Sequence, residues 1–379
     1  MRIVVAMDSF KGSLSSPQAG EAVRAGIRRA DPAAEVNVLP LADGGEGTVD
    51  ALISCMGGEI HRIFVTGPLG DPVNCEYGVL PDEHTAVVEM CSTAGLTLVP
   101  ENRRDPRYTT TFGVGEVIRD AIRLGCRKFL IGIGGSATND GGAGMLQALG
   151  FELLDAEGNP ILRGAEGLKY LSQICDENAL PELKECSFRI ACDVTNPLCG
   201  PNGCSAVYGP QKGATPEMIP EMDDALKAYA ELAKKKFPEA DADYPGAGAA
   251  GGMGFAFRTF LQAELTPGVK IVTEETQLEA YIREADYVVT GEGRLDGQTG
   301  SGKAPLGVAR IAKKYGKPVI AFAGSVTEEA SALHSEGIDA FFPIVRGAVT
   351  LEEAMEPEHA KKNLAATAEE VFRLISGRR

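Results

Sequence analysis

The chain of 379 residues is long enough for two domains, each with its own hydrophobic core. It contains 37 Lys and Arg against 53 Asp and Glu, and the resulting net charge of −16 argues against a general nucleic-acid or anionic-membrane surface. Any anionic ligand must therefore be met by positive groups close to its own site.

The cysteines and histidines exclude further classes of site. The nine cysteines form no CxxC pair, and the four scattered histidines offer neither a zinc spacing nor a Ser/His/Asp constellation. The first apolar stretch is too short for a signal peptide, and no apolar run approaches the ~18 residues of a membrane span. We expect a cytoplasmic protein with reduced thiols, and neither a membrane nor nucleic acid as a partner.

The N-terminal part alternates strands with helices. The expected elements are a strand at 2–7, a helix at 17–30, a strand at 35–40, a helix at about 46–56 and a strand near Ile60. Ser16 and Pro17 predict the start of the first helix, as its N-cap and its first-turn proline.

Two loops in this part place polar side chains at the ends of strands. The segment 8–13 (DSFKGS) follows the first strand, and the segment 42–48 (ADGGEGT) follows the second. Adjacent parallel strands bring such loops to one edge of the sheet, where they fit Mg²⁺ or a polyhydroxylated substrate. Solvated turns and helix caps are the structural alternatives.

The middle part is bounded by turn clusters at 66–72 (TGPLGDP) and 265–268 (LTPG), which suit chain crossings between domains. We expect an inserted domain there, with short strands at 75–80 and 86–90 and an amphipathic helix around Val117. The segment 239–254, first acidic and then glycine-rich, is typical of a flexible cleft edge.

A glycine-rich loop at 134–142 (GGSATNDGG) lies between a predicted strand at 128–133 and a predicted helix starting near Ala143. Its glycines let the backbone approach a charged group, and the helix turns unsatisfied N–H groups and its positive dipole end toward the same space. Phosphate is the commonest ligand of such a site.

Two other interpretations of this loop stay open. Gly132, Gly134 and Ala137, with Asp155 after the next apolar run, imitate a dinucleotide fingerprint, although 138–142 add a turn before the helix. A purely structural glycine-rich turn is the second alternative.

A further strand at 188–192 ends at Asp193, in the segment 193–198 (DVTNPL), and 209–215 (GPQKGAT) follows shortly after. Asp193 fits a general base or an Mg²⁺ ligand, and equally an ordinary turn former. Its position alone does not separate these roles.

The C-terminal part again alternates strands with helices. We expect strands at 269–273, 286–290, 318–323 and 339–345, and helices near 275–284, 305–315, 328–335 and 361–375. This alternation predicts a parallel sheet with helices on both faces and ligands at the carboxyl ends of the strands.

The loop 290–304 (TGEGRLDGQTGSGKA) contains six of the seven positions of a Walker A motif. Ala304 replaces the hydroxyl residue that would meet Mg²⁺, so a true P-loop is not expected. An anion-contacting loop with Arg294 and Lys303 as charge partners is the favoured interpretation, and a solvated turn is the alternative.

Six segments together resemble the bacterial type I glycerate kinases: 8–13, 43–48, 134–142, 193–197, 209–214 and 290–296. The resemblance implies an α/β fold in which a Rossmann-like parallel-sheet domain is interrupted by a second, inserted mixed-sheet α/β domain. The expected domains are 1–66 plus 268–379 and 67–267, with the active-site cleft between them. The implied reaction is the ATP-dependent phosphorylation of D-glycerate, usually at the 2-hydroxyl, giving 2-phosphoglycerate and ADP.

Phosphoryl transfer requires an anion cradle, cations, Mg²⁺ and a group that receives the hydroxyl proton, which gives each loop a hypothetical role. We assign catalysis to Asp193 as base and to Lys11 and Arg294 as charge partners. Substrate contacts are expected from Asp8, Ser9, Asp43, Glu46, Asn196 and Asp296. ATP phosphates are expected at Gly134, Gly135, Ser136, Thr138, Asn139, Asp140, Lys212 and Lys303. Mg²⁺ ligands are expected among Asp43, Glu46 and Asp296.

Two other functions are weighed against the kinase. An NAD-dependent hydroxy-acid dehydrogenase would bind NADH tightly, and a non-catalytic nucleotide or sugar-acid sensor would bind ATP without turnover. The sequence does not decide whether the 2- or the 3-hydroxyl of glycerate is phosphorylated. It also does not decide how many chains associate, and a homodimer is one option.

Overall fold

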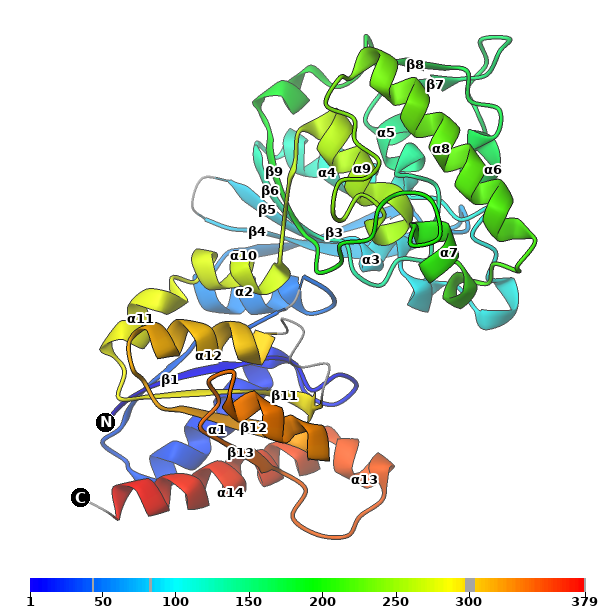
Figure 1. Ribbon diagram of the computed structural model, residues 1–379. Coiled ribbons are helices and arrows are strands. Elements are labelled where there is room, and N and C mark those ends of the chain that lie inside the picture. Colours follow the sequence, from blue (N-terminus) through cyan, green and yellow to red (C-terminus); the bar gives the residue numbers. More distant parts are fainter. Residues whose placement is uncertain (43, 82–83, 297–303, 378–379) are drawn as a thin grey trace. The chain divides into compact units, whose positions relative to one another are not determined.

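The computed structural model describes residues 1–42, 44–81, 84–296 and 304–377, and the chain divides into two compact units (Figure 1). The first, which we call the terminal unit, comprises Met1–Asp43, Asp50–Gly57 and Val269–Arg379. The second, the inserted unit, comprises Gly44–Val49 and Gly58–Gly268. Both ends of the chain therefore build one unit, and the middle builds the other.

The terminal unit contains a five-stranded parallel sheet with the strand order β13-β12-β11-β1-β2. Its strands are β1 (Arg2–Met7), β2 (Glu35–Val38), β11 (Tyr287–Leu295), β12 (Val319–Val326) and β13 (Ala340–Pro343). The predicted parallel α/β architecture is thus confirmed. The central strands are apolar runs because helices cover both faces of such a sheet.

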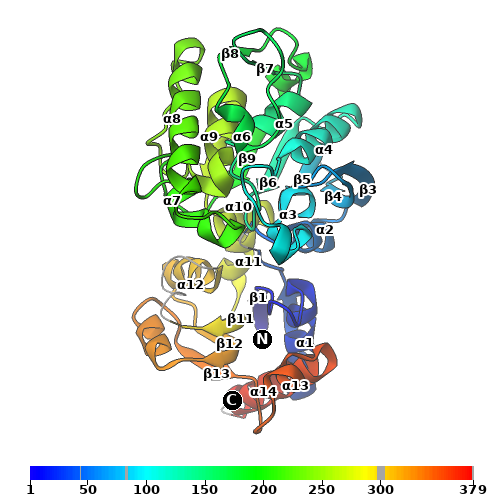
Figure 2. The ribbon, with the colours of Figure 1, turned by 90° about the vertical axis from the view of Figure 1, so that its right-hand side faces the viewer.

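Helices lie on both faces of this sheet (Figure 2). On one face α1 (Ser16–Ala30) packs against α14 (Pro357–Ser376), and both contact a core of side chains such as Val5 and Phe322. On the other face lie α11 (Leu278–Glu284) and α12 (Ala304–Lys314). Shorter elements are the 3₁₀ helix Glu328–His334 and α13 (Leu351–Met355).

Helix α1 begins one residue earlier than expected, with Ser15 as its N-cap and Gln18 completing a capping box. Ser16 is buried and has a different task. Its hydroxyl donates to the Met7 carbonyl at 2.6 Å and accepts from the Leu41 N–H at 2.8 Å. Ser16 therefore ties together the chain segments that leave β1 and β2.

The inserted unit contains a six-stranded mixed sheet with the order β10-β9-β6-β5-β4-β3. Its strands are β3 (Glu59–Thr66), β4 (Pro72–Val79), β5 (Thr85–Glu89), β6 (Lys128–Gly132), β9 (Ser187–Ala191) and β10 (Glu264–Thr266). The pairs from β5 to β10 are parallel, whereas β3, β4 and β5 are antiparallel. A small hairpin consists of β7 (Glu152–Leu154) and β8 (Gln173–Cys175).

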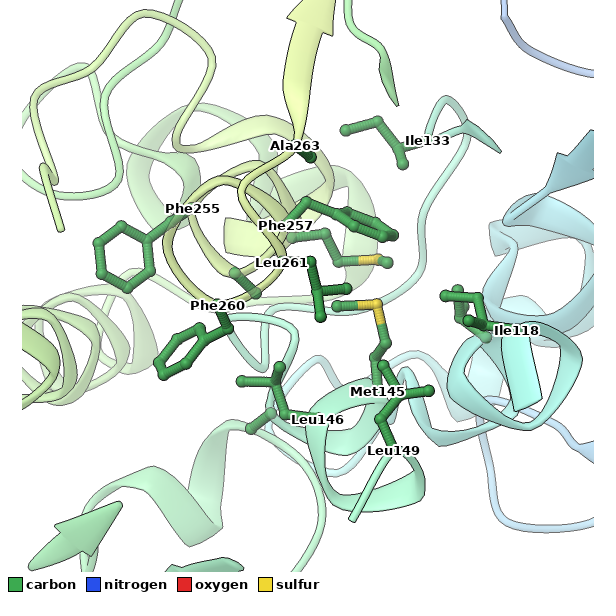
Figure 3. Close-up of a cluster of buried hydrophobic side chains, with 14 of the residues drawn as sticks. Ile118, Ile133, Met145, Leu146, Leu149, Phe255, Phe257, Phe260, Leu261 and Ala263 are labelled. Carbon is green, nitrogen blue, oxygen red and sulfur yellow. The ribbon is translucent and has the colours of Figure 1, made fainter. Parts of the chain in front are cut away.

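The core of the inserted unit lies between its sheet and three helices, α4 (Phe112–Arg123), α5 (Ala143–Ala148) and α9 (Ala249–Leu261). Figure 3 shows side chains of these helices, such as Met145 and Leu261, converging on one another. The other helices of this unit are α3 (Cys91–Ala94), α6 (Ala165–Leu168), α7 (Cys204–Tyr208) and α8 (Met218–Lys236). Most of α2 (Thr48–Met56) and of α10 (Gly268–Glu275) belongs to the terminal unit. Within the described ranges, no helix is both long and apolar enough to span a membrane.

Two expectations about these elements are wrong. The strand β3 pairs with β4 in the inserted unit, so the domain boundary expected after residue 66 lies between residues 57 and 58. The segment 269–273, expected as a strand, is part of helix α10, where Ile271 and Val272 are buried. Its β-branched residues favour a strand locally, and burial of one helical face overrides that preference.

Candidate functional site

In the terminal unit, polar side chains gather where β1 and β11 end. Asp8 is buried, its backbone N–H donates to the Gly291 carbonyl at 2.8 Å, and its Oδ1 accepts from the Ser9 N–H at 2.7 Å. Glu292 on β11 is buried as well. The neighbouring strand ends thus bring Asp8 and Ser9 to the edge at which the sequence predicts them.

Lys11 and Arg294 belong to chain segments that touch at this same edge. A Cβ on Gly293 would lie 3.4 Å from the Cα of Phe10 and 3.6 Å from the N of Lys11, so the loop after β1 lies against β11. Arg294 Nε lies 3.4 Å from Asp296 Oδ2, and the arginine side chain is 65% exposed. An exposed pair of this kind contributes less than ~1 kcal/mol, so Arg294 can exchange its partner for a ligand carboxylate or phosphate.

In the inserted unit, the glycine loop (residues 134–142) follows β6. The Leu96 N–H donates to the Gly135 carbonyl at 2.8 Å, and the Ala137 N–H donates to the Ala94 carbonyl at 2.9 Å. Gly134 and Gly135 are exposed, and within the part of the chain that is described their backbone N–H groups donate no hydrogen bond. A fixed loop with open backbone donors is a cradle for an anion.

Asp140 occupies the start of helix α5, where the sequence places a phosphate. Its carboxylate accepts from Thr111 N and Oγ1, both at 2.9 Å, from Gly142 N at 3.1 Å and from Gly144 N at 3.2 Å. The side chain is fully buried, and this burial raises the pKa of Asp140 while the hydrogen bonds oppose the shift. The carboxylate therefore caps the helix, and this geometry gives no support to the predicted contact of Asp140 with ATP phosphates.

Lys212 lies behind the glycine loop. It ends the 3₁₀ helix Pro210–Lys212, is 2% exposed, and its Nζ donates to Ser136 Oγ at 2.7 Å and to the Thr138 carbonyl at 2.6 Å. Burial lowers the pKa of Lys212 to about 8, although Cys204 and Asp140 act in the opposite direction. The ammonium, expected at ATP phosphates, supports the loop from within.

Two side chains of the glycine loop keep unpaired polar atoms. Asn139 Nδ2 donates to Ser205 Oγ at 2.8 Å, but Asn139 Oδ1 and Thr138 Oγ1 are buried without a hydrogen-bond partner among the described residues. An unsatisfied buried polar atom costs about 1–3 kcal/mol. Both residues are fully buried, so these atoms belong to the interior of the loop.

The glycine-rich part of 239–254 is buried against the glycine loop, so the prediction of a flexible cleft edge is wrong for it. Gly251 has φ +67°, and a Cβ there would lie 2.0 Å from the Thr138 carbonyl oxygen. The Gly141 N–H donates to the Gly251 carbonyl at 2.9 Å. Only glycine permits this close approach, which braces the loop from behind.

The segment Gly44–Val49 crosses the carboxyl ends of β6 and β9. A Cβ on Gly132 would lie 1.9 Å from the Gly44 carbonyl oxygen, and a Cβ on Gly44 would lie 2.1 Å from the Cβ of Ala191. The exposed Glu46 is thereby carried to the same edge as the glycine loop.

Glu89, at the end of β5, is a site residue that the sequence interpretation missed. Its Oε1 accepts from the Val49 N–H at 2.8 Å and so anchors the crossing segment. Burial raises the pKa of Glu89, and the charge of Glu46 acts in the same direction. The available signal was a carboxylate closing the apolar run of β5.

Asp193 and Asn196 follow β9. Asp193 is exposed, and its Oδ1 accepts from the Gly268 N–H at 3.1 Å. Asn196 uses both ends of its amide locally, because Nδ2 donates to the Asn202 carbonyl at 2.9 Å and Oδ1 accepts at 2.6 Å from the OH of Tyr208, the last residue of α7. Asn196 therefore shapes the loop, while Asp193 presents a carboxylate at the strand edge.

The three residues predicted for Mg²⁺ are not brought together within one unit. Glu46 belongs to the inserted unit and Asp296 to the terminal unit, whereas Asp43 lies outside the described residues, as does Lys303. In the described ranges, no group of three His, Cys, Asp or Glu side chains is arranged to hold a metal ion.

Parallel strand edges, a donor-rich glycine loop, cations and accessible carboxylates are the features of an α/β phosphotransferase. The chain belongs to the Glycerate kinase family, whose model matches residues 3–376. The resemblance seen in the six sequence segments is thus confirmed. This match gives no support to the dehydrogenase and sensor alternatives.

Individual relatives match over nearly their full length. The chain is 50% identical over 372 residues to the glycerate 2-kinase of Escherichia coli (strain K12), covering 97% of this chain and 98% of that protein. It is 48% identical over 371 residues to the glycerate kinase of Bacillus subtilis (strain 168), covering 98% and 97%. A crystal structure from Salmonella typhimurium LT2, assigned as a glycerate kinase 2, has a TM-score of 0.91 at 48% identity and covers 100% of this chain and 98% of its own.

Proposed function

We propose that this protein transfers the γ-phosphoryl group of ATP to the 2-hydroxyl of D-glycerate, giving 2-phosphoglycerate and ADP. The observation that carries the proposal is the glycine loop, which presents the open backbone donors of Gly134 and Gly135 in a member of the Glycerate kinase family. The 2-position follows the name of the Escherichia coli relative.

The nucleotide phosphates bind at the outer side of the glycine loop. Gly134, Gly135 and Ser136 supply backbone N–H groups, while the fully buried Thr138 and Asn139 lie behind them in the loop. Such preorganised donors stabilise charge on a transferring phosphoryl group without reorganisation during the reaction. Asp140 contributes only through the shape of the loop, because its carboxylate is committed to α5.

Glycerate binds through the polar edge of the terminal unit. Lys11 and Arg294 neutralise its carboxylate or the moving phosphoryl group, and Asp8, Ser9 and Asp296 bind its hydroxyls. The weak pair with Asp296 supports the role of Arg294, since the exposed arginine side chain can turn to a ligand at little cost.

Asp193 is the general base that receives the proton of the attacking hydroxyl. It follows β9, whose neighbour β6 leads into the glycine loop, and Ala191 pairs with Gly132 in the sheet register. Base and phosphate cradle thus start from adjacent strand ends of one unit. An exposed aspartate at this edge has the acceptor oxygen that the reaction needs.

Mg²⁺ would be held by ATP phosphates together with Glu46, and Asp43 and Asp296 are the further candidates. Carboxylate oxygens fit a hard cation, which usually takes one or two of them plus substrate phosphates. The ion neutralises charge between the phosphates when bound. Removal of divalent ions with EDTA should abolish turnover, and added Mg²⁺ should restore it.

The proposed compartment is the cytoplasm. All nine cysteines are free, which suits a reducing environment such as the cytoplasm, where ATP is available. D-glycerate and ATP are the proposed small-molecule partners.

The test is a coupled assay for ADP release with the purified protein, ATP, Mg²⁺ and D-glycerate, with L-glycerate and glycolate as controls. We expect ADP release that depends on D-glycerate. No release above the controls would overturn the substrate, and tight NADH binding under the same conditions would reopen the dehydrogenase.

A further inference from the structure

Lys212 is the only Lys or Arg that is buried among the described residues, and its surroundings are unusual for a cation. Burying an ammonium without a counter-ion is costly. Asp140 is near enough to act on its charge, but within the described residues the two form no ion pair, and the carboxylate accepts instead from Thr111 and from N–H groups at the start of α5. A charge kept at this cost marks a functional candidate.

Both hydrogen bonds of the Lys212 ammonium go to the glycine loop. Ser136 Oγ and the Thr138 carbonyl lie on either side of Ala137, at 2.7 and 2.6 Å from Nζ. Only 2% of Lys212 is exposed, so its ammonium has no surface to offer a ligand on the outer side of the loop.

The contact with Ser136 also directs the hydroxyl. Because Ser136 Oγ accepts from Lys212, its own O–H proton is free to donate elsewhere, and the hydroxyl becomes a donor for an anion. The Thr138 carbonyl is held inward by the second bond, which turns a negative group of the loop away from the ligand side.

We propose that Lys212 is a positioning residue of the nucleotide site: it fixes the glycine loop in its anion-binding conformation and adds positive charge beneath it, without touching the nucleotide. This inference rests on the proposed function insofar as the phosphates bind at that loop. It differs from a purely structural role because the charge of Lys212 is then coupled to the charge of the ligand.

The first test measures proton uptake during binding of MgADP to the wild-type protein, by calorimetry at about pH 8 in buffers of different ionisation enthalpy. An anion at the loop favours the charged lysine, so binding should take up a fraction of a proton. The titratable groups that face Lys212 are Asp140 of the loop and Cys204 of α7, whose pKa is raised by burial to about 11. Binding without proton uptake would overturn the proposal.

The second test replaces the charge and keeps the volume. Lys212→Met should abolish the proton uptake and weaken MgADP binding about tenfold or more, while the KM for D-glycerate stays within about twofold. The matched control is Lys236→Met, which removes an inserted-unit lysine paired at the surface with Asp176 and Glu177. It should leave the proton uptake and the MgADP affinity unchanged. Wild-type MgADP affinity in a folded Lys212→Met variant would contradict the proposal.

A third variant covers the case in which Lys212→Met does not fold. Ser136→Ala removes one acceptor of the ammonium and the hydroxyl that it directs, and it should weaken MgADP binding several-fold relative to the wild type. Unchanged affinity would contradict the proposal. Calorimetry with MgADP needs no glycerate, so a protein that binds MgADP with proton uptake but does not turn over D-glycerate would sink the proposed function alone.

Discussion

At the scale of single residues, burial separates the charged groups of the candidate site into two sets. Asp140 and Lys212 are enclosed and bond to the backbone and hydroxyls that shape the glycine loop. Asp193 and Arg294 are exposed at strand edges, where a ligand can reach them. The first set controls conformation, and we expect the second set to meet the substrates.

The base assignment predicts a specific loss in Asp193→Asn. Asparagine keeps a carbonyl oxygen that can accept from the Gly268 N–H, so the fold should be retained, whereas a proton acceptor is lost. We expect kcat to fall by ~10²-fold or more with little change in either KM. Steady-state kinetics measure this, with Asp155→Asn as control, because Asp155 also accepts from backbone N–H groups but in a remote turn. Near wild-type kcat in folded Asp193→Asn would end the assignment.

The buried ammonium predicts how stability depends on pH. The folded pKa of Lys212, about 8, lies below the ordinary lysine value of ~10.4, so the unfolded chain binds more protons between these values. The stability that Lys212 contributes is therefore present above the unfolded pKa and is lost as pH falls toward 8. The free energy of unfolding of the wild type, relative to Lys212→Met, should rise with pH across this window by on the order of 1 kcal/mol per pH unit.

Denaturant unfolding at several pH values measures this difference, and subtraction removes the groups that both proteins share. Lys236→Met serves as the surface control. Parallel curves for the wild type and Lys212→Met would show that the lysine is not held at a depressed pKa.

At the scale of elements, the glycine loop depends on backbone contacts that leave no room for side chains. Gly251→Ala would place a Cβ 2.0 Å from the Thr138 carbonyl oxygen at a positive φ. We expect the free energy of unfolding to drop by about 3 kcal/mol or more and MgADP binding to weaken, because the loop must move. Denaturation midpoints and calorimetry measure the two effects.

Gly158→Ala is the matched control, since Gly158 also has a positive φ but nothing lies within 4 Å of a Cβ there. It should cost only the conformational strain, about 1 kcal/mol, and leave binding unchanged. Equal losses in the two variants would mean that backbone strain, not the contact with Thr138, accounts for the effect.

The sequence predicted most elements because their periodicity or apolar content is strong. The apolar runs of β1 and β6 and the amphipathic pattern of α1 lie where they were expected. It failed at 269–273, where Val269, Ile271 and Val272 favour a strand but belong to helix α10. Local preference cannot register which tertiary surface buries those side chains.

The sequence predicted which loops carry the candidate site residues, but not which partners their side chains contact. Strand-to-helix loops rich in glycine and polar residues predicted Asp8 at the strand edge of the terminal unit, and Ser136 and Asp193 at the strand edge of the inserted unit. The partners of Lys212 lie 76 and 74 residues away along the chain, and no spacing rule connects them. Likewise, nothing local shows that Asp140 turns inward to cap α5 or that Glu89 anchors the segment carrying Glu46.

At the scale of the whole molecule, a chain with a net charge of −16 must provide for two anionic substrates. We propose that each unit does so at the carboxyl edge of its parallel strands. The terminal unit gathers Lys11 and Arg294, and the inserted unit offers backbone donors with Lys212 beneath them. Local groups thus oppose the overall charge where ligands are proposed to bind.

The most direct measurement is a phosphorus NMR time course of the wild-type protein with ATP, Mg²⁺ and D-glycerate. We predict that the γ-phosphate signal of ATP declines while a phosphomonoester signal grows, split into a doublet by the single proton on C2 of 2-phosphoglycerate. A triplet from the two C3 protons would contradict the 2-hydroxyl as acceptor. Unchanged ATP signals with D-glycerate present would contradict the kinase activity itself.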